Sequence, residues 1–356
     1  MDFSLNEKQR QIIERARQYA AEYLAPTVVQ RDEACEYSME AFNKLGELGF
    51  IGLPYDAQYG GTEGGYLEYV LAVEEISKVE GAMGNSFSVC ASLFCGPLNR
   101  FGTEAQKKKF MPPVLKGEAL GAFCLTEAEA GSDASRIETT ALRDGDDYIV
   151  NGVKCFITNA PIAGYYLLIA ATNPEAGIKG LSALIVDRNS PGIRMGRFEN
   201  KMGIRPVQVS EVIFENVRVP AENLLGKEGE GFKIAMNTLD DGRLGVAAQA
   251  LGIAGGAFEI ARKHLMQREQ FGKPLYKNQY LAFKMAELKI KLEQARLLLH
   301  KAVFVKESGQ RYTTDAAMAK YVCSNLAMEV TTEAVQMLGG RGNEIQKLIV
   351  GGDIFK

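Results

Sequence analysis

The sequence predicts an α+β protein with an N-terminal all-helical domain (residues 1–120), a central antiparallel β-barrel domain (121–225) and a C-terminal helical bundle (226–356). Two observations lead to this prediction. Apolar residues recur at helical spacing in the first third of the chain, alternate with polar residues in the middle, and return to helical spacing after about residue 230. The length of 356 residues also fits two or three domains of roughly 150 residues each.

In the N-terminal part, Ser4-x-x-Glu7 reads as a capping box that opens a helix, and Pro26 marks the predicted end of that helix. A second capping box, Thr103-x-x-Gln106, opens a short basic helix that Pro112-Pro113 should end. The helical segments predicted after Pro26 are Met39–Leu48, Leu67–Val79, Phe87–Arg100 and Gln106–Met111.

In the middle part, the dipeptide Asn151-Gly152 is a strong signal for a hairpin turn. Short strands separated by such turns indicate a small antiparallel barrel, and the βαβ alternation of a Rossmann unit is not found there. The predicted strands are Tyr148–Val150, Lys154–Ile157, Tyr165–Ala171, Ser182–Val186, Ile193–Arg197 and Val212–Val217.

Three long helical runs are predicted in the last third: Gly231–Gln267, Asn278–Glu307 and Thr314–Leu338. Small residues are frequent in the first of them, which permits the close helix–helix approach of a bundle core. Because helices of this length usually pack against another subunit as well, we expect an oligomer.

Composition excludes several classes of function. The chain is 46% hydrophobic and 24% charged, with a net charge of −3, as in an ordinary globular protein with a sizeable core. The absence of a basic block argues against nucleic acid as a partner. No apolar run reaches the roughly 18 residues of a membrane span, and the start MDFS does not resemble a signal peptide, so we expect a cytoplasmic protein.

Metal and disulfide chemistry is not indicated. The two histidines, His264 and His300, fall inside helical patterns and are interpreted as satisfied helix-surface side chains. The cysteines show no CxxC spacing and are interpreted as reduced and mostly buried; they are Cys35, Cys90, Cys95, Cys124, Cys155 and Cys323.

Two segments of the middle part end in polar groups. FCLTEAEAGSD begins at Phe123 and KCFITN begins at Lys154; each starts with β-prone residues and closes in hydroxyls, a carboxylate or an amide. Together they can present backbone N–H groups, Thr126, Thr158 and the aromatic Phe156 to one flat polar ligand. An ordinary hairpin with a polar loop would show the same composition.

FCLTEAEAGSDAS followed by KCFITNA resembles the flavin-binding signature pair of the acyl-CoA dehydrogenases. The similarity extends over nearly the whole chain up to Gly340 and is closest to the short-chain, butyryl-type branch. The resemblance implies an acyl-CoA dehydrogenase-like fold, FAD as cofactor, a short acyl-CoA as substrate and an electron-transferring flavoprotein as partner. It also implies a homotetramer built as a dimer of dimers.

By this resemblance, groups of Leu125, Thr126, Phe156 and Thr158 contact the flavin ring, which needs hydrogen bonds along its edges and an apolar surface under its face. Each threonine alone could equally be a strand-surface residue. Relatives complete the diphosphate and adenine end from a neighbouring subunit, and the matching residues here are Arg268, Phe271, Gln336, Gly339 and Gly340. Arginine suits a pyrophosphate, although Arg268 could also be a solvated helix-end charge.

The acyl-CoA site of relatives matches Ser132, Asp240 and Arg243, and Ser132 also belongs to the flavin-side loop. The pair Asp240 and Arg243 also fits an ordinary i, i+3 salt bridge. Both interpretations stay open.

The resemblance breaks where the family places its catalytic base. Relatives have a Glu in a Y-E-G-T segment upstream of an E-I-Q helix, whereas this chain passes from Leu338-Gly339-Gly340 directly into Arg341-Gly342-Asn343-Glu344-Ile345-Gln346. About six helical turns, at ~3.6 residues per turn, are absent. The isovaleryl-type branch has its base at the position of Gly242, so that substitute is missing too. Glu344 is the only nearby carboxylate that could substitute for the missing base, although in relatives its counterpart lies near the adenine end of the flavin.

The contribution of the missing Glu to catalysis has a known order of magnitude. A positioned base contributes ~10²–10⁴-fold, and the same Glu supplies one of two N–H donors to the thioester carbonyl, a contribution of ~2.7–4 kcal/mol in other enzymes. We therefore expect impaired α,β-dehydrogenation. The rival hypothesis is a non-catalytic FAD- and acyl-CoA-binding or scaffold protein that keeps the fold.

Overall fold

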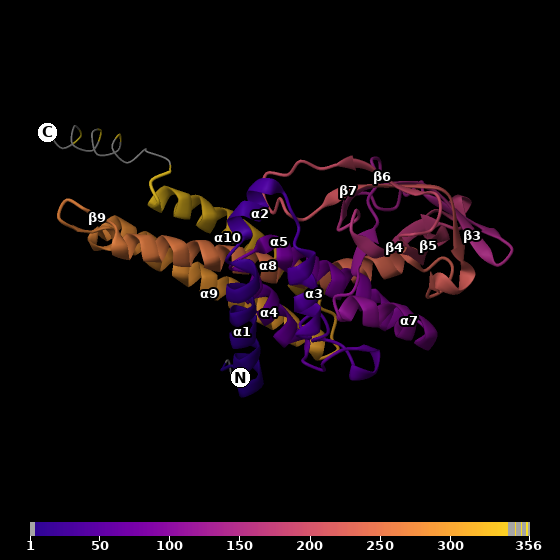
Figure 1. The fold of residues 1–356 in the computed structure, drawn as a ribbon, viewed down its shortest axis with the longest axis horizontal. Coiled ribbons are helices and arrows are strands. Elements are labelled where there is room, and N and C mark those ends of the chain that lie inside the picture. Colours follow the sequence, from indigo (N-terminus) through magenta and orange to yellow (C-terminus); the bar gives the residue numbers. More distant parts are fainter. Residues whose placement is uncertain (1–3, 341–345, 347–349, 351–353, 355–356) are drawn as a thin grey trace.

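The computed structural model describes residues 4–340 and, beyond them, residues 346, 350 and 354. Helices from both ends of the sequence form one elongated body, and the β-sheet lies at one end of it (Figure 1). The predicted order of helices, sheet and helices is confirmed.

The N-terminal part is all-helical. Its first helix begins two residues later than predicted, because Asn6 and not Ser4 is the N-cap: the Oδ1 of Asn6 accepts the N–H of Gln9, and the Oε1 of Gln9 accepts the N–H of Asn6. The helical segments are α1 (Glu7–Tyr19), η1 (Ala20–Leu24), α2 (Val28–Ala34), α3 (Met39–Glu47), η2 (Ala57–Tyr59), α4 (Tyr66–Ser77), α5 (Gly81–Ser88), η3 (Val89–Cys95), α6 (Gly96–Phe101) and α7 (Glu104–Leu115).

Helix α7 corrects a second expectation. The capping box of Thr103 and Gln106 is confirmed, but the helix continues through Pro112 and Pro113 to Leu115. Each proline removes one N–H from the helix, and the carbonyls that lose a partner belong to Lys108 and Lys109. Both residues are exposed, so water can satisfy these carbonyls and the helix is not forced to stop.

The sheet has the strand order β6-β7-β3-β2-β4-β5-β8, and β1 pairs with β4. Among the described residues, β6 and β8 do not pair with each other, so the sheet is not closed into a barrel. Most pairs are antiparallel, but β1 runs parallel to β4, and β2 makes a short parallel contact with β4 at Thr140 and Ala171. The strands are β1 (Leu120–Cys124), β2 (Thr140–Asp144), β3 (Asp147–Thr158), β4 (Ala163–Ala171), β5 (Leu181–Asp187), β6 (Ile193–Phe198), β7 (Val209–Pro220) and β8 (Leu224–Leu225).

The predicted hairpin turn at Asn151-Gly152 is wrong. Strand β3 runs straight through it, and a bulge between Val150 and Gly152 accommodates the glycine, whose φ is 151°. The Oδ1 of Asn151 accepts the N–H of Asn216 on β7 at 2.8 Å. The turn between β2 and β3 lies earlier, at Gly145, where φ is 61°.

The C-terminal part consists of α8 (Gly231–Gln267), α9 (Gln279–Glu307) and α10 (Thr313–Met337), which confirms the three predicted runs to within one residue. A small hairpin of β9 (Glu269–Gln270) and β10 (Lys273–Pro274) joins α8 to α9. By length and composition α8 could cross a membrane, but 72% of its most apolar window is buried, as in the core helix of a bundle.

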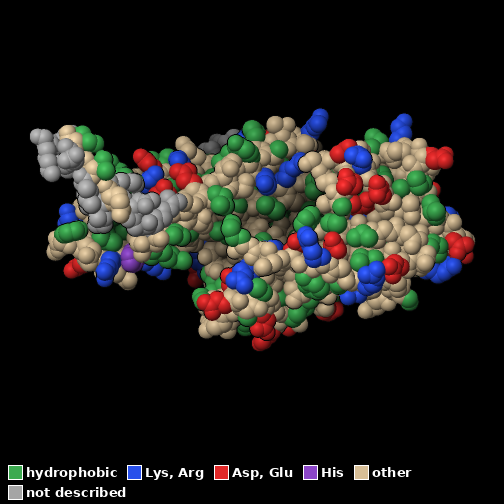
Figure 2. Space-filling model, turned by 90° about the horizontal axis from the view of Figure 1, so that it is seen from above, with side chains coloured by type: hydrophobic (Ala, Val, Ile, Leu, Met, Phe, Trp, Pro, Cys, Tyr) green, Lys and Arg blue, Asp and Glu red, His purple; other side chains and the backbone are tan. Residues whose placement is uncertain are grey.

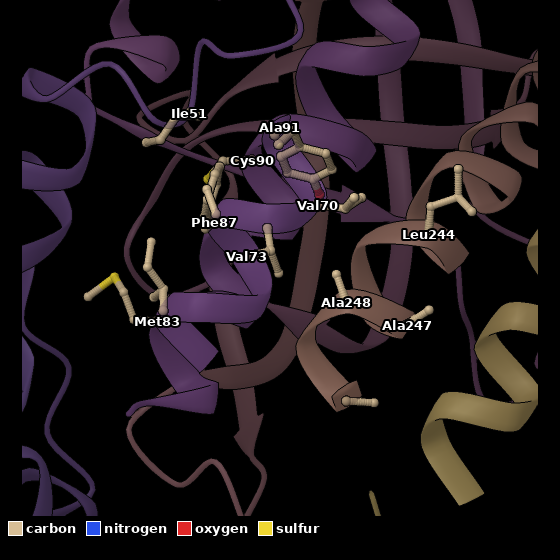
Figure 3. Close-up of a cluster of buried hydrophobic side chains, with 14 of the residues drawn as sticks. Ile51, Val70, Val73, Met83, Phe87, Cys90, Ala91, Leu244, Ala247 and Ala248 are labelled. Atoms are coloured by element: carbon tan, nitrogen blue, oxygen red, sulfur yellow. The ribbon is translucent and has the colours of Figure 1, made fainter. Parts of the chain in front are cut away.

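The main core lies where α8 meets the N-terminal helices. Figure 3 shows Val70 and Val73 of α4, Phe87 of α5 and Ala247 and Ala248 of α8 converging in this cluster. The helical domains at the two ends of the chain therefore share one core and support the sheet from one side.

All six cysteines lie in the described part of the chain and are free, and five of them are buried. His300 on α9 corrects the expectation of a satisfied surface histidine. It is half-buried, and among the described residues its buried Nε2 has no hydrogen-bond partner. Burial lowers the pKa of its imidazole.

Candidate functional site

The two polar segments that follow β1 and end β3 lie side by side. The N–H of Cys155 donates to the carbonyl of Thr126 at 2.8 Å. The Nζ of Lys154 donates to the carbonyl of Leu125 at 3.0 Å. The fold therefore brings Leu125, Thr126 and the segment after Lys154 to one edge of the sheet.

This edge offers hydrogen-bonding groups that the protein does not use itself. Thr126 and Thr158 are both half-buried, and among the described residues neither hydroxyl has a hydrogen-bond partner. An aromatic surface lies beside them, because the side chain of Phe156 is 58% exposed. Unpaired hydroxyls next to an exposed aromatic face are the donor set that a flavin ring needs.

Phe156 has an unusual backbone. Its φ of 58° is in the left-handed region, which a bulky residue adopts only when its surroundings impose it. The strain coincides with a bulge between Lys154 and Ile157 in the pairing of β3 with β7. The bulge interrupts the alternation of the strand and turns the ring outward.

Asn159 holds the end of β3 in place. The sequence motif contains this residue but gave no indication of its structural role. It is fully buried; its Oδ1 accepts the hydroxyl of Ser86 on α5 at 2.8 Å, and its Nδ2 donates to the carbonyl of Gly121 on β1 at 3.2 Å. Its own N–H donates to the carbonyl of Gln208. One amide thus joins the N-terminal helices, β1 and β3 directly behind Thr158.

A buried ion pair lies between the two segments and was also missed. Lys154 is 0% exposed, and its Nζ is 2.7 Å from the Oε1 of Glu127. Glu127 in turn accepts the N–H groups of Glu138 and Thr139 at 2.7 and 3.1 Å. The signal was present in the sequence: Lys154 follows Tyr148 and Val150 at even spacing, on the core-facing side of the strand.

The pKa values of Lys154 and Glu127 are both lowered, but for different reasons. Burial lowers the pKa of the Lys154 ammonium, although Glu127 opposes this. For Glu127, burial alone would raise the pKa, but the charge and hydrogen bond of Lys154, together with the hydrogen bonds from Thr139 and Glu138, outweigh it and lower the pKa. At neutral pH we take both groups as charged.

The predicted substrate residues are not all in one place. Ser132 is exposed in the loop between β1 and β2, next to Asp133, which accepts the N–H of Ser135. Asp240 and Arg243 form the i, i+3 salt bridge on α8, and the Oδ2 of Asp240 also accepts the hydroxyl of Thr313 at 2.7 Å. The Arg243 side chain is still 37% exposed, so the salt bridge leaves it accessible to a ligand.

Gly242 is buried against η3. A Cβ atom at this position would be 2.5 Å from the Cδ2 of Leu93. The position where the isovaleryl-type branch has its base is therefore occupied by the leucine side chain.

The residues predicted for the far end of the cofactor lie at the opposite end of the molecule. Arg268 and Phe271 are at the β9–β10 hairpin, far from β3 and β4 (Figure 1). Gln336, Gly339 and Gly340 are at the end of α10. Phe271 is 90% exposed at the tip of the hairpin. Within one chain these groups do not meet Thr126 and Thr158, and Glu344 lies outside the described residues.

The surface between the two parts of the molecule is hollowed. Figure 2 shows the hollow between the helical part and the sheet-bearing part on the face that it draws. Helix α5 packs against the sheet edge at Thr158, because the hydroxyl of Ser86 donates to the Oδ1 of the adjacent Asn159.

Three family models match the chain in succession. They are the N-terminal domain of acyl-CoA dehydrogenase at residues 6–118, the middle domain at residues 122–217 and the C-terminal domain at residues 229–350.

Individual relatives are similar over the full length. The short-chain specific acyl-CoA dehydrogenase of Clostridium acetobutylicum is 43% identical over 379 aligned positions, which cover 100% of both chains. The solved structure of butyryl-CoA dehydrogenase from Megasphaera elsdenii is 44% identical, covers 100% of both chains and superposes with a TM-score of 0.94. A chain in the structure of the electron transferring flavoprotein of Acidaminococcus fermentans is 50% identical, covers 96% of this chain and 90% of its own, and has a TM-score of 0.94.

Proposed function

Because the chain belongs to the acyl-CoA dehydrogenase family, we propose that it is an FAD-dependent oxidoreductase for the α,β-dehydrogenation of a short-chain acyl-CoA. Electrons from this reaction pass to an electron-transferring flavoprotein. The observation that carries the proposal is the full-length similarity to short-chain enzymes together with the paired polar segments at Thr126 and Thr158.

The cofactor is FAD. The residues proposed for its ring are Leu125, Thr126, Phe156 and Thr158, and the unpaired hydroxyls and exposed ring at this edge support the assignment. When bound, FAD supplies the acceptor for the hydride that leaves the β-carbon of the acyl chain. The chain itself orients the ring and excludes water around it.

The opposite end of FAD requires a second subunit. Arg268 and Phe271 project at the end of the molecule away from the sheet, so they can serve only the cofactor of a neighbouring chain. Gln336, Gly339 and Gly340 are proposed for the same role. This arrangement supports a homotetramer built as a dimer of dimers.

The CoA part of the substrate is proposed to contact Ser132, Asp240 and Arg243. Arg243 is the group suited to a phosphate or a carbonyl, because its guanidinium is fixed by Asp240 and remains accessible. We place the domain boundaries near residues 120 and 225, and we propose a water-soluble protein that acts in the cytoplasm.

Proton removal is the weak step of this chain. The alignment with the Clostridium acetobutylicum enzyme spans 379 positions against 356 residues here, so at least 23 aligned positions have no residue in this chain. A gap of this length after Gly340 would remove the segment that supplies the base in relatives. We therefore propose that the chain binds FAD and acyl-CoA but removes the α-proton ~10²–10⁴-fold more slowly than an enzyme that has the base. The second candidate function, a non-catalytic FAD- and acyl-CoA-binding protein, rests on the same gap.

Anaerobic titration with butyryl-CoA tests the proposal. The purified protein should be yellow, and its flavin absorbance should fall slowly, faster when acetate is added as an external base. Flavin that never bleaches, with or without acetate, would establish the non-catalytic candidate. A protein that binds no FAD would overturn both.

A further inference from the structure

The buried ion pair of Lys154 and Glu127 lies next in sequence to the residues proposed to contact the flavin. Leu125 and Thr126 come directly before Glu127 in sequence, and Cys155 and Phe156 come directly after Lys154. The ion pair therefore joins the two segments directly beside the residues proposed to contact the flavin.

Apart from the bond between the two side chains, every side-chain hydrogen bond that the pair makes within the described part of the chain goes to the backbone of these segments or of the loop beside them. Lys154 donates to Glu127 and to the carbonyl of Leu125. Glu127 accepts the N–H groups of Glu138 and Thr139, where the loop after Thr126 returns to β2. Both ends of that loop are thereby fixed to β3.

The pair is not needed to explain stability. Exchanging a buried ion pair for apolar residues of similar volume is often neutral or stabilising, because desolvation offsets the attraction between the charges. What an apolar pair could not supply is a hydrogen bond to the Leu125 carbonyl and a defined position for the strained residue Phe156, two residues after Lys154.

We propose that Lys154 and Glu127 are positioning residues for the flavin ring. They hold Leu125–Thr126 and Cys155–Phe156 in register, and as a neutral pair they leave no net charge beside the ring. This inference rests on FAD binding by the chain, which the proposed function includes.

The neutral pair gives the proposal an electrostatic signature. Lys154→Met leaves the Glu127 carboxylate alone, and a nearby anion disfavours the electron-rich reduced flavin, so the midpoint potential should fall. Glu127→Gln leaves Lys154 without its carboxylate, which lowers the pKa of the amine further; at a pH low enough to keep the amine protonated, the midpoint potential should rise. A pair with a structural role only would not shift the potential in opposite directions.

The chain supplies a matched control. Arg31 on α2 and Glu80 form another buried ion pair, at 2.6 Å, with side chains 9% and 2% exposed, and this pair touches neither polar segment. Arg31→Met should lower the melting temperature and leave the FAD dissociation constant and the midpoint potential at wild-type values.

The experiment measures the FAD dissociation constant, the midpoint potential and the melting temperature of the full chain and the three variants. We expect at least about tenfold weaker FAD binding for Lys154→Met, potentials shifted in opposite directions for Lys154→Met and Glu127→Gln, and neither change for Arg31→Met. If Lys154→Met does not fold, Lys154→Arg replaces it; the larger guanidinium keeps the charge but must displace the Leu125 carbonyl, so FAD binding should weaken.

Two results would overturn the inference. One is wild-type FAD affinity and potential in Glu127→Gln and in whichever Lys154 variant folds. The other is a loss of affinity that follows the melting temperature equally in these variants and in Arg31→Met. Failure of the proposed function is distinguishable, since in that case the wild-type chain binds no FAD.

Discussion

Gly256 of α8 lies against the backbone of Lys78: a Cβ atom on the glycine would be 2.1 Å from the Lys78 carbonyl oxygen. A backbone atom cannot swing aside as a side chain can. The separation between α8 and the end of α4 is therefore set by the absence of a side chain at this position. The neighbouring Gly255 is different, because its Cβ would meet only the flexible Lys78 side chain, at 3.4 Å.

Alanine at these two adjacent positions should have opposite effects. Gly256→Ala should lower the free energy of unfolding by about 1–3 kcal/mol, because the helices must separate. Gly255→Ala should raise it by up to about 1 kcal/mol through helix propensity. Urea unfolding of both variants measures the difference, and equal effects would contradict the close approach.

A tryptophan at position 156 should report on the cofactor. The chain contains no tryptophan, so Phe156→Trp would be the only indole fluorophore. Because the ring at this position is exposed beside Thr126 and Thr158, FAD should quench its emission and shift the maximum to shorter wavelength. Ile178→Trp, a comparably exposed position on the sheet-bearing part, is the control and should show no shift. An unchanged maximum for Phe156→Trp would place the flavin elsewhere.

A line of apolar side chains on α9 should be a subunit interface. Phe283, Ile290, Leu297 and Phe304 recur every seven residues and are 60%, 57%, 49% and 63% exposed. Residues seven apart lie on nearly the same side of a helix, and a stripe of this length is typical of helix packing. Replacing Ile290 and Leu297 with Glu should reduce the mass of the assembly in sedimentation analysis.

Ile178→Glu is the matched control for that experiment, since Ile178 is 45% exposed but isolated on another part of the molecule. It should leave the assembly unchanged. A double α9 variant that sediments like the wild type would exclude this face as the interface.

His300 should make stability depend on pH. Burial lowers the pKa of its imidazole below the ordinary value of 6.5, so on acidification the unfolded chain takes up the proton first. Stability from this group is complete above the unfolded pKa and is lost as pH falls below it, by up to about 1.4 kcal/mol per pH unit. Urea unfolding at pH 5 to 8 should show a shallower decline in His300→Gln than in the wild type. Equal slopes would remove His300 as the cause.

The sequence was most informative where one periodicity runs over many residues. The three C-terminal helices could be placed to within a residue because each has more than twenty residues of helical pattern. The hairpin turn predicted at Asn151-Gly152 is wrong because a local turn signal carries no information about pairing with a distant strand. Strand β7 pairs with both sides of the dipeptide, and this long-range pairing overrides the turn. Pro112 and Pro113 were misjudged because the cost of a proline depends on whether water reaches the freed carbonyls.

The candidate site could be located from its motifs, but its support could not. Thr126 and Thr158 were found by their resemblance to a known signature. Lys154 and Asn159 belong to the same motif, yet their partners Glu127, Ser86 and Gly121 are set by the tertiary fold. Alternation along β3 placed Lys154 on the buried side, and only the three-dimensional arrangement shows which carboxylate neutralises it.

The separation of the Phe271 hairpin from the Thr158 edge has a practical consequence. In the proposed assembly one subunit holds the ring and another closes over the nucleotide end, so the colour of a preparation should report on assembly. A solution diluted until its subunits part should release FAD and turn pale, and concentrating it with FAD should restore the yellow colour. Loss of pigment during purification would then reflect dissociation of subunits, with each polypeptide still folded.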